Sequence, residues 1–153
     1  CPYVFPITTF PFLLMLRCEK LSHVLLGDYS ALYSELGELT PCRVRQDGSS
    51  GNPQGGVTIY AGFDSRLERI KSIVGGRNNC NAKQKLSIAE SLLERTVESV
   101  EIYSRIPELQ IEFSLGLWLT TFNLEAGQPI WEVGFNKPSL GFLCIKRGVL
   151  HVA

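Results

Sequence analysis

Residues 109–121 carry the pattern that most limits how this chain can fold. Apolar residues occupy every second position of this run, at Leu109, Ile111, Phe113, Leu115, Leu117 and Leu119. Successive side chains of a strand point to opposite faces, so a period of two predicts a strand with one face against a core. The run is also long enough to be a helix, which remains the alternative.

Shorter runs predict the rest of a sheet. Val57–Ala61 is β-branched and aromatic, which is typical of a strand. Ile130–Phe135 and Gly141–Lys146 predict two more strands, and Val149–Val152 predicts a last short one. These segments together predict a small, mostly antiparallel sheet.

The N-terminal part of the chain has helical spacing instead. Pro11 suits a first helical turn, where its missing N–H costs nothing, and leucines follow it to a break at Gly27. A second short helix is predicted over Ser30–Leu36, because apolar and aromatic residues recur at helical spacing at Tyr29, Leu32, Tyr33 and Leu36. We therefore expect helices before residue 45.

The middle of the chain predicts two further helices. Ser65 and Glu68 form a capping-box pattern, which predicts a short helix that ends at Gly75-Gly76. Residues 82–104 predict a long amphipathic helix, because apolar side chains recur three or four positions apart at Leu86, Ala89, Leu93, Val97 and Val100.

These elements predict an α+β fold with N-terminal helices and a long central amphipathic helix packed on a small, mostly antiparallel sheet. With 153 residues the chain is long enough to bury a substantial core. The segment 46–56 is rich in Gly, Ser, Asn and Pro and predicts a surface loop. It would separate a helical segment over 1–45 from an α+β domain over 57–153, unless the two form one continuous domain.

Composition narrows the class of function. Fifteen basic residues balance fifteen acidic ones, so no nucleic-acid partner is expected from charge. No apolar run is long enough to predict a membrane span. The five scattered cysteines favour reduced thiols in a cytosolic or nuclear setting. The chain does not begin with Met, and we expect it to be a piece of a longer protein.

Catalytic and metal-binding patterns are weak. Cys80 precedes the predicted central helix, whose N-terminus could lower a thiol pKa, and His23 and His151 are the only candidate bases. Cys18 and His23 are the only closely spaced pair of metal-ligand type, with no second half. The sequence therefore predicts a protein that is not an enzyme and that has no catalytic residues, no metal site and no cofactor.

One short motif points to a function. Phe10-Pro11-Phe12-Leu13-Leu14 resembles the minimal F-box, L-P-x-x-L/I, of the silencing suppressors of poleroviruses, with Phe in place of the leading Leu. The leucine-rich continuation over 18–28 and the later segments GGVTIY, SRLERI and IPELQIEFSLGLWLTTFNLEAGQ are similar to that family in the same order. In the family a proline follows within about a dozen residues, whereas here the next one is Pro41.

The resemblance implies a viral suppressor of RNA silencing that works as an F-box-like adaptor in the host cell cytoplasm. It implies a Skp1-like host protein as one partner and an Argonaute protein, destined for degradation, as the other. The F-box-like residues would be Phe10, Pro11, Leu13 and Leu14, with the apolar ones as anchors in a groove of the partner. Two alternatives remain: a small hydrolase that uses Cys80 or His23, and a suppressor that binds RNA directly.

Overall fold

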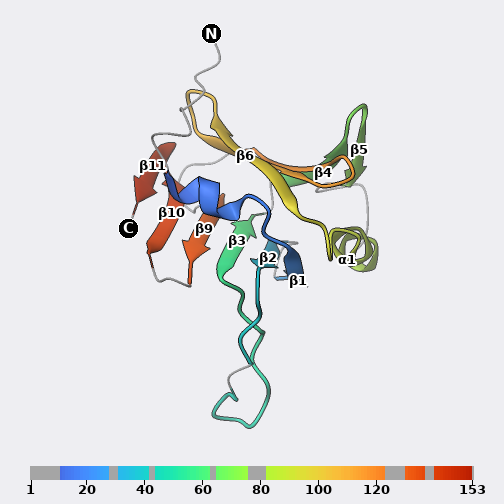
Figure 1. Cartoon of the computed structure of the whole chain (residues 1–153), viewed down its shortest axis with the longest axis vertical. Helices are drawn as coiled ribbons and strands as arrows, with labels where there is room; N and C mark the ends of the chain where they lie inside the picture. The colour runs from blue at the N-terminus through green and yellow to red at the C-terminus, as the bar shows by residue number, and fades with distance from the viewer. Residues whose placement is uncertain are drawn as a thin grey trace.

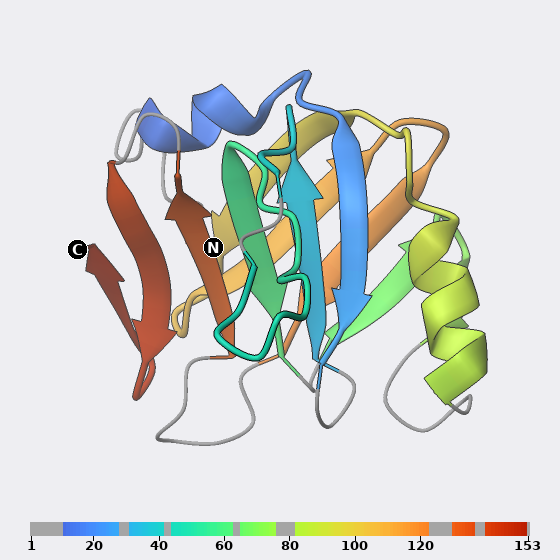
Figure 2. The same ribbon diagram turned by 90° about the horizontal axis from the view of Figure 1, so that it is seen from below.

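The computed structural model describes residues 11–27, 31–41, 44–62, 65–75, 82–122, 130–136 and 140–152. Within these residues the chain forms two antiparallel β-sheets packed face to face, with one short α-helix at the side (Figure 1). The strands of one sheet run diagonally behind those of the other (Figure 2).

The first sheet has six strands in the order β1-β2-β3-β9-β10-β11. Their bounds are β1 Leu21–Leu26, β2 Leu32–Leu36, β3 Val57–Ala61, β9 Trp131–Phe135, β10 Gly141–Lys146 and β11 Val149–Val152. The central contact, β3 with β9, joins segments about seventy residues apart in the chain, with Ile59 opposite Val133. Strands from both ends of the sequence therefore share this sheet.

The second sheet has five strands in the order β5-β4-β8-β7-β6. Their bounds are β4 Ser65–Arg69, β5 Ser72–Gly75, β6 Val97–Tyr103, β7 Glu108–Phe113 and β8 Leu117–Thr121. A tight turn joins β7 to β8, with Leu115 and Gly116 at positive φ. The run 109–121 is thus strand, as predicted, but it is a hairpin of two strands rather than one.

The core lies between the sheets and is built from the alternate residues of each strand. Its largest fully buried side chains are Trp131, Phe113, Leu16, Leu21, Leu36, Ile59, Leu92, Leu109, Ile111, Leu119, Leu143 and Ile145. The indole N–H of Trp131 on β9 donates to the carbonyl of Pro107, which lies between β6 and β7, at 3.2 Å. This hydrogen bond satisfies the buried indole and links the two sheets.

A 3-10 helix, η2 (Pro11–Leu16), precedes β1 and lies along one end of the sandwich (Figure 2). The chain then pairs with the segment that leads into β6. The N–H of Cys18 donates to the carbonyl of Val97 at 2.8 Å, and the N–H of Leu21 donates to that of Arg95 at 2.8 Å. These bonds connect an outer strand of each sheet at one corner of the sandwich.

The α+β fold prediction is wrong, because the described residues form a mostly β structure with a single short α-helix, α1 (Ala82–Glu90). The three C-terminal strand predictions and that of Val57–Ala61 are confirmed. The expected helices are wrong. The first, from Pro11 to the break at Gly27, is only the short 3-10 helix η2 followed by strand β1.

The expected helix over Ser30–Leu36 is strand β2. Leu32 and Leu36 are both buried, with Ser34 buried between them. A spacing of four residues places two side chains on one face of a helix and equally on one face of a strand. The leucine spacing therefore did not distinguish the two.

The expected long helix over 82–104 stops at Glu90, turns through 91–94, and continues as β6. A β-bulge between Val97 and Ser99 shifts the register of β6. The bulge lets Val97 and Val100 both face the core, three residues apart, which imitates a helical spacing. No Gly or Pro marks the break.

The expected helix that starts at Ser65 is the hairpin of β4 and β5. Ile70, assigned to the apolar face of that helix, is 80% exposed at the tip of the hairpin. Leu67 is buried in the core and Val74 packs against it, whereas Ile73 is exposed. The helical spacing of Leu67, Ile70, Ile73 and Val74 therefore does not define one buried face, and pairing with the neighbouring strand decides the backbone conformation.

Candidate functional site

The predicted docking residues fall partly on η2. Phe10 lies outside the described residues, and Pro11 begins η2. Leu13 is 6% exposed and belongs to the core, whereas Leu14 is 52% exposed and its neighbour Met15 is 40% exposed. The motif thus divides into a buried leucine that holds the turn and an exposed leucine that is available to a partner.

The candidate catalytic residues are not gathered within the described part of the chain. Cys80 lies outside it, His23 is on β1, and the exposed His151 is on β11. Cys144 is buried opposite His151, and burial raises the pKa of its thiol. A raised pKa disfavours the thiolate that nucleophilic catalysis needs.

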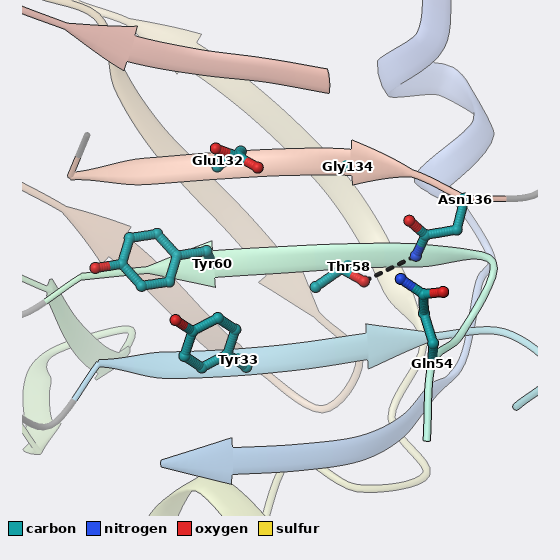
Figure 3. Close-up of a pocket in the computed structure, with 7 residues that line it drawn as sticks. All are labelled: Tyr33, Gln54, Thr58, Tyr60, Glu132, Gly134 and Asn136. Carbon is teal, nitrogen blue, oxygen red and sulfur yellow. Dashed lines mark hydrogen bonds between the residues drawn. The ribbon is translucent and has the colours of Figure 1, made fainter. Parts of the chain in front are cut away.

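The described residues form a pocket on the outer face of the six-stranded sheet (Figure 3). It has a volume of about 440 Å³ and is lined by Tyr33, Gln54, Thr58, Tyr60, Glu132, Gly134 and Asn136. Strand register explains how residues so far apart in sequence come together. One row across the sheet is Tyr33, Tyr60 and Glu132. The next row is Glu35, Thr58 and Gly134.

The first row gives the pocket an aromatic end with one carboxylate. The rings of Tyr33 and Tyr60 lie side by side, with their centroids 5.1 Å apart and their planes tilted by 54°. Figure 3 places both rings on neighbouring strands, with Glu132 on the far side of Tyr60. The pKa of Tyr60 is raised by burial and, to a smaller extent, by Tyr33 and Glu132. Burial at this end of the pocket therefore disfavours the ionised form of the Tyr60 hydroxyl.

The other end of the pocket is a closed hydrogen-bond network. The N–H of Gly55 and the hydroxyl of Thr58 donate to Glu35 Oε2, at 3.0 Å and 2.7 Å. Asn136 Nδ2 donates to the carbonyl of Gly55 at 3.0 Å and to Thr58 Oγ1 at 2.8 Å. The network ties β2, β3 and the turn after β9 to the base of an arm, described over 37–41 and 44–56, which projects from the outer face (Figures 1 and 2).

Glu35 is the titratable member of this network. It is 8% exposed, and burial raises its pKa above the usual range, although the bonds from Thr58 and Gly55, and His23 opposite it, act in the other direction. A raised pKa in the folded state means that the unfolded chain ionises first as pH rises. Folding is therefore favoured below the ordinary pKa of a glutamate, and this contribution is lost as pH rises through the folded-state pKa.

We expect Glu35→Gln to remove this loss. Its free energy of unfolding should improve relative to the unmodified chain as pH rises from 4 to 7, because Gln still accepts both hydrogen bonds but never ionises. Each unit by which the pKa differs between the folded and unfolded states corresponds to about 1.4 kcal/mol in the free energy of unfolding. Urea denaturation across this pH range measures the difference. Glu101→Gln, at an exposed position on β6, is the control. A difference that does not vary with pH would contradict the assignment.

Gly134 leaves the floor of the pocket open. A Cβ at this position would meet only Asn136 Oδ1 and the carbonyl of Thr58, both at 3.9 Å, which is ordinary contact. A larger residue could therefore stand there, and its absence makes room between Thr58 and the next strand. No group of three or more His, Cys, Asp or Glu side chains is placed to hold a metal ion in the described ranges.

Sequence reasoning did not find this pocket. Strand alternation at Val57–Ala61 could have identified Thr58 and Tyr60 as outward-facing, since that strand was predicted correctly. Tyr33 was assigned to a helix, and nothing in the sequence places β3 beside β9. The pocket thus depends on long-range pairing that the local pattern does not encode.

Comparison of the chain with protein-family models, curated proteins and solved structures found no match. In the part of the chain that the structure describes, no helix is long and apolar enough to cross a membrane.

Proposed function

We propose that this protein is a non-enzymatic adaptor that docks a partner protein through η2, with Leu14 as the main anchor. The observation that carries the proposal is the division of η2 into two faces. Leu13 and Leu16, three residues apart, are 6% and 0% exposed, whereas Leu14 and Met15 between them are 52% and 40% exposed. In a 3-10 helix, residues three apart share one face.

The two buried leucines hold the exposed pair in place. Leu13 and Leu16 both belong to the core cluster. The N–H of Arg17 donates to the carbonyl of Leu14 at 3.2 Å, and the next residue, Cys18, is bonded to Val97. A turn fixed at both ends loses little conformational freedom when a partner covers it, so more of the contact energy appears as affinity.

The resemblance to polerovirus suppressors supplies the identity of the partners in this proposal. η2 would dock a Skp1-like subunit of a host ubiquitin ligase in the host cell cytoplasm, and a second surface would recruit an Argonaute protein. The structure alters the set of anchors, because Leu13 is committed to the core. A strand, β1, also follows η2 where the leucine pattern predicts a helix. Leu14, with Met15 beside it, is therefore the described anchor.

The test is capture of a purified plant Skp1-like protein. We expect Leu14→Ser/Met15→Ser to reduce its affinity tenfold or more, because removing central apolar anchors typically costs that much. Leu115→Ser is the control, since Leu115 is 87% exposed in the β7–β8 turn, outside η2. Equal capture by all three proteins would remove η2 as the docking element.

Failure of the unmodified chain to bind the Skp1-like protein would remove the F-box identity itself. The RNA-binding alternative has its own test. A gel shift with short duplex RNA would support it only if binding were strong and fell steeply with salt, which a chain with balanced charge is not expected to show.

A further inference from the structure

We propose that the pocket on the outer face of the six-stranded sheet binds a quaternary ammonium group, with the rings of Tyr33 and Tyr60 and the carboxylate of Glu132 as its recognition elements. This site is separate from η2 and does not depend on the adaptor proposal.

At the polar end of the pocket, the Thr58 hydroxyl and the Asn136 amide nitrogen are already hydrogen-bonded within the protein. The Thr58 hydroxyl donates to Glu35 and accepts from Asn136. The amide nitrogen of Asn136 also donates to the carbonyl of Gly55. A sugar or other polyol needs several free donors and acceptors at fixed positions. Here the Thr58 hydroxyl and the Asn136 amide nitrogen already take part in the network that holds the base of the arm.

The aromatic end is different. Glu132 is half-buried, and among the described residues it has no ion-pair partner. No lysine or arginine lines the pocket. An unpaired carboxylate beside aromatic rings attracts a cation and repels phosphate or carboxylate ligands.

The rings favour an alkylated cation over a strongly hydrated one. Tyr33 and Tyr60 stand in register on adjacent strands, next to Glu132 in the same row. Figure 3 shows the two rings and the carboxylate on the same face of the sheet. A quaternary ammonium group lacks N–H donors, so it needs no hydrogen bonds and is recognised by aromatic faces and a nearby negative charge.

The expected binding is weak and selective. Tyr33 is 37% exposed, so the pocket is open to solvent and we expect a millimolar dissociation constant for choline. The neutral isostere 3,3-dimethylbutan-1-ol has the same shape without the charge. We expect it to bind about three- to tenfold more weakly, which is the range of a partly exposed cation–π site.

The experiment is an NMR titration of the full chain with choline, followed at the amides of the pocket, including Gly134. Glu132→Gln and Tyr60→Leu should each weaken binding about three- to tenfold. Glu98→Gln, an exposed glutamate on β6, should leave it unchanged. Tyr33→Leu replaces any variant that fails to fold, because Tyr33 is the more exposed ring.

A second arm separates the sources of the ammonium group. A short peptide with a central trimethyllysine that binds more tightly than choline would assign the site to a modified protein tail, and the reverse would assign it to a free metabolite. Equal affinity for choline and its neutral isostere would overturn the proposal. So would choline shifts outside the pocket, or unchanged affinity in Glu132→Gln.

Discussion

Replacing Phe113 by alanine is expected to lower the free energy of unfolding by about 3–5 kcal/mol. Phe113 is fully buried on β7 and fills the space between the two sheets. Its register partners are Val97 on β6 and Leu117 on β8. The cavity left between the sheets could therefore be filled only if β6, β7 and β8 moved together. Urea denaturation followed by circular dichroism measures the change.

Leu115→Ala is the matched control for this prediction. Leu115 is two residues away, holds the same phase in the apolar alternation, and is 87% exposed in the turn. We expect its replacement to change stability by less than about 0.5 kcal/mol. Comparable losses for both variants would show that residues 109–121 form one continuous element instead of a hairpin.

The alternation over 109–121 predicts the strands of this run but not the turn that divides them. Period two identified strand correctly, because both β7 and β8 put alternate residues into the core. The same pattern hid the turn, since Leu115 continues the alternation although it lies outside the core. Side-chain periodicity reports the local period of the backbone and not whether the chain reverses.

The failed helices share a different cause. Val97 and Val100 face the core because of a bulge, and Leu32 and Leu36 do so because four is an even number. Spacings of three and four residues are also those of one face of a helix, so the sequence pattern alone cannot exclude a helix. The choice of strand is made by neighbours distant in sequence, such as β3 beside β2 and β7 beside β6, whose backbone groups complete the ladders.

The two candidate sites differ in the same way, because one depends on local sequence and the other on long-range strand pairing. The exposed leucine of the docking motif could be proposed from sequence, since the motif is local. The pocket could not, because its rows of residues exist only when β2, β3 and β9 are neighbours. Tyr33 and Glu132 are almost a hundred residues apart in the chain and stand on either side of Tyr60.

Gly55→Ala is expected to lower the free energy of unfolding by at least about 2 kcal/mol, the range of substitutions that displace a buried backbone segment. A Cβ on Gly55 would lie 2.3 Å from the carbonyl oxygen of Leu36 and 3.0 Å from its carbonyl carbon and nitrogen. These are backbone atoms of β2, so no side chain can rotate away. The strand or the base of the arm must move.

Movement of Gly55 would also break the network at the polar end of the pocket. Gly55 donates to Glu35 and accepts from Asn136, so its displacement leaves a buried carboxylate and an amide short of partners. Because the arm returns to the sheet at this point, we expect Gly55→Ala to increase cleavage within 44–54 in limited proteolysis. Binding of choline at the aromatic end should weaken less than stability falls.

Gly134→Ala is the matched control for Gly55→Ala. It makes the same substitution in the same pocket, but its nearest contacts would be 3.9 Å away. We expect a change within about 1 kcal/mol, in the stabilising direction, because glycine is unfavourable in a strand interior. If both variants lost stability equally, the close approach of Gly55 to Leu36 would not be what fastens the arm. A selective loss at Gly55 would identify that contact as the point where the arm is fixed to the sheet.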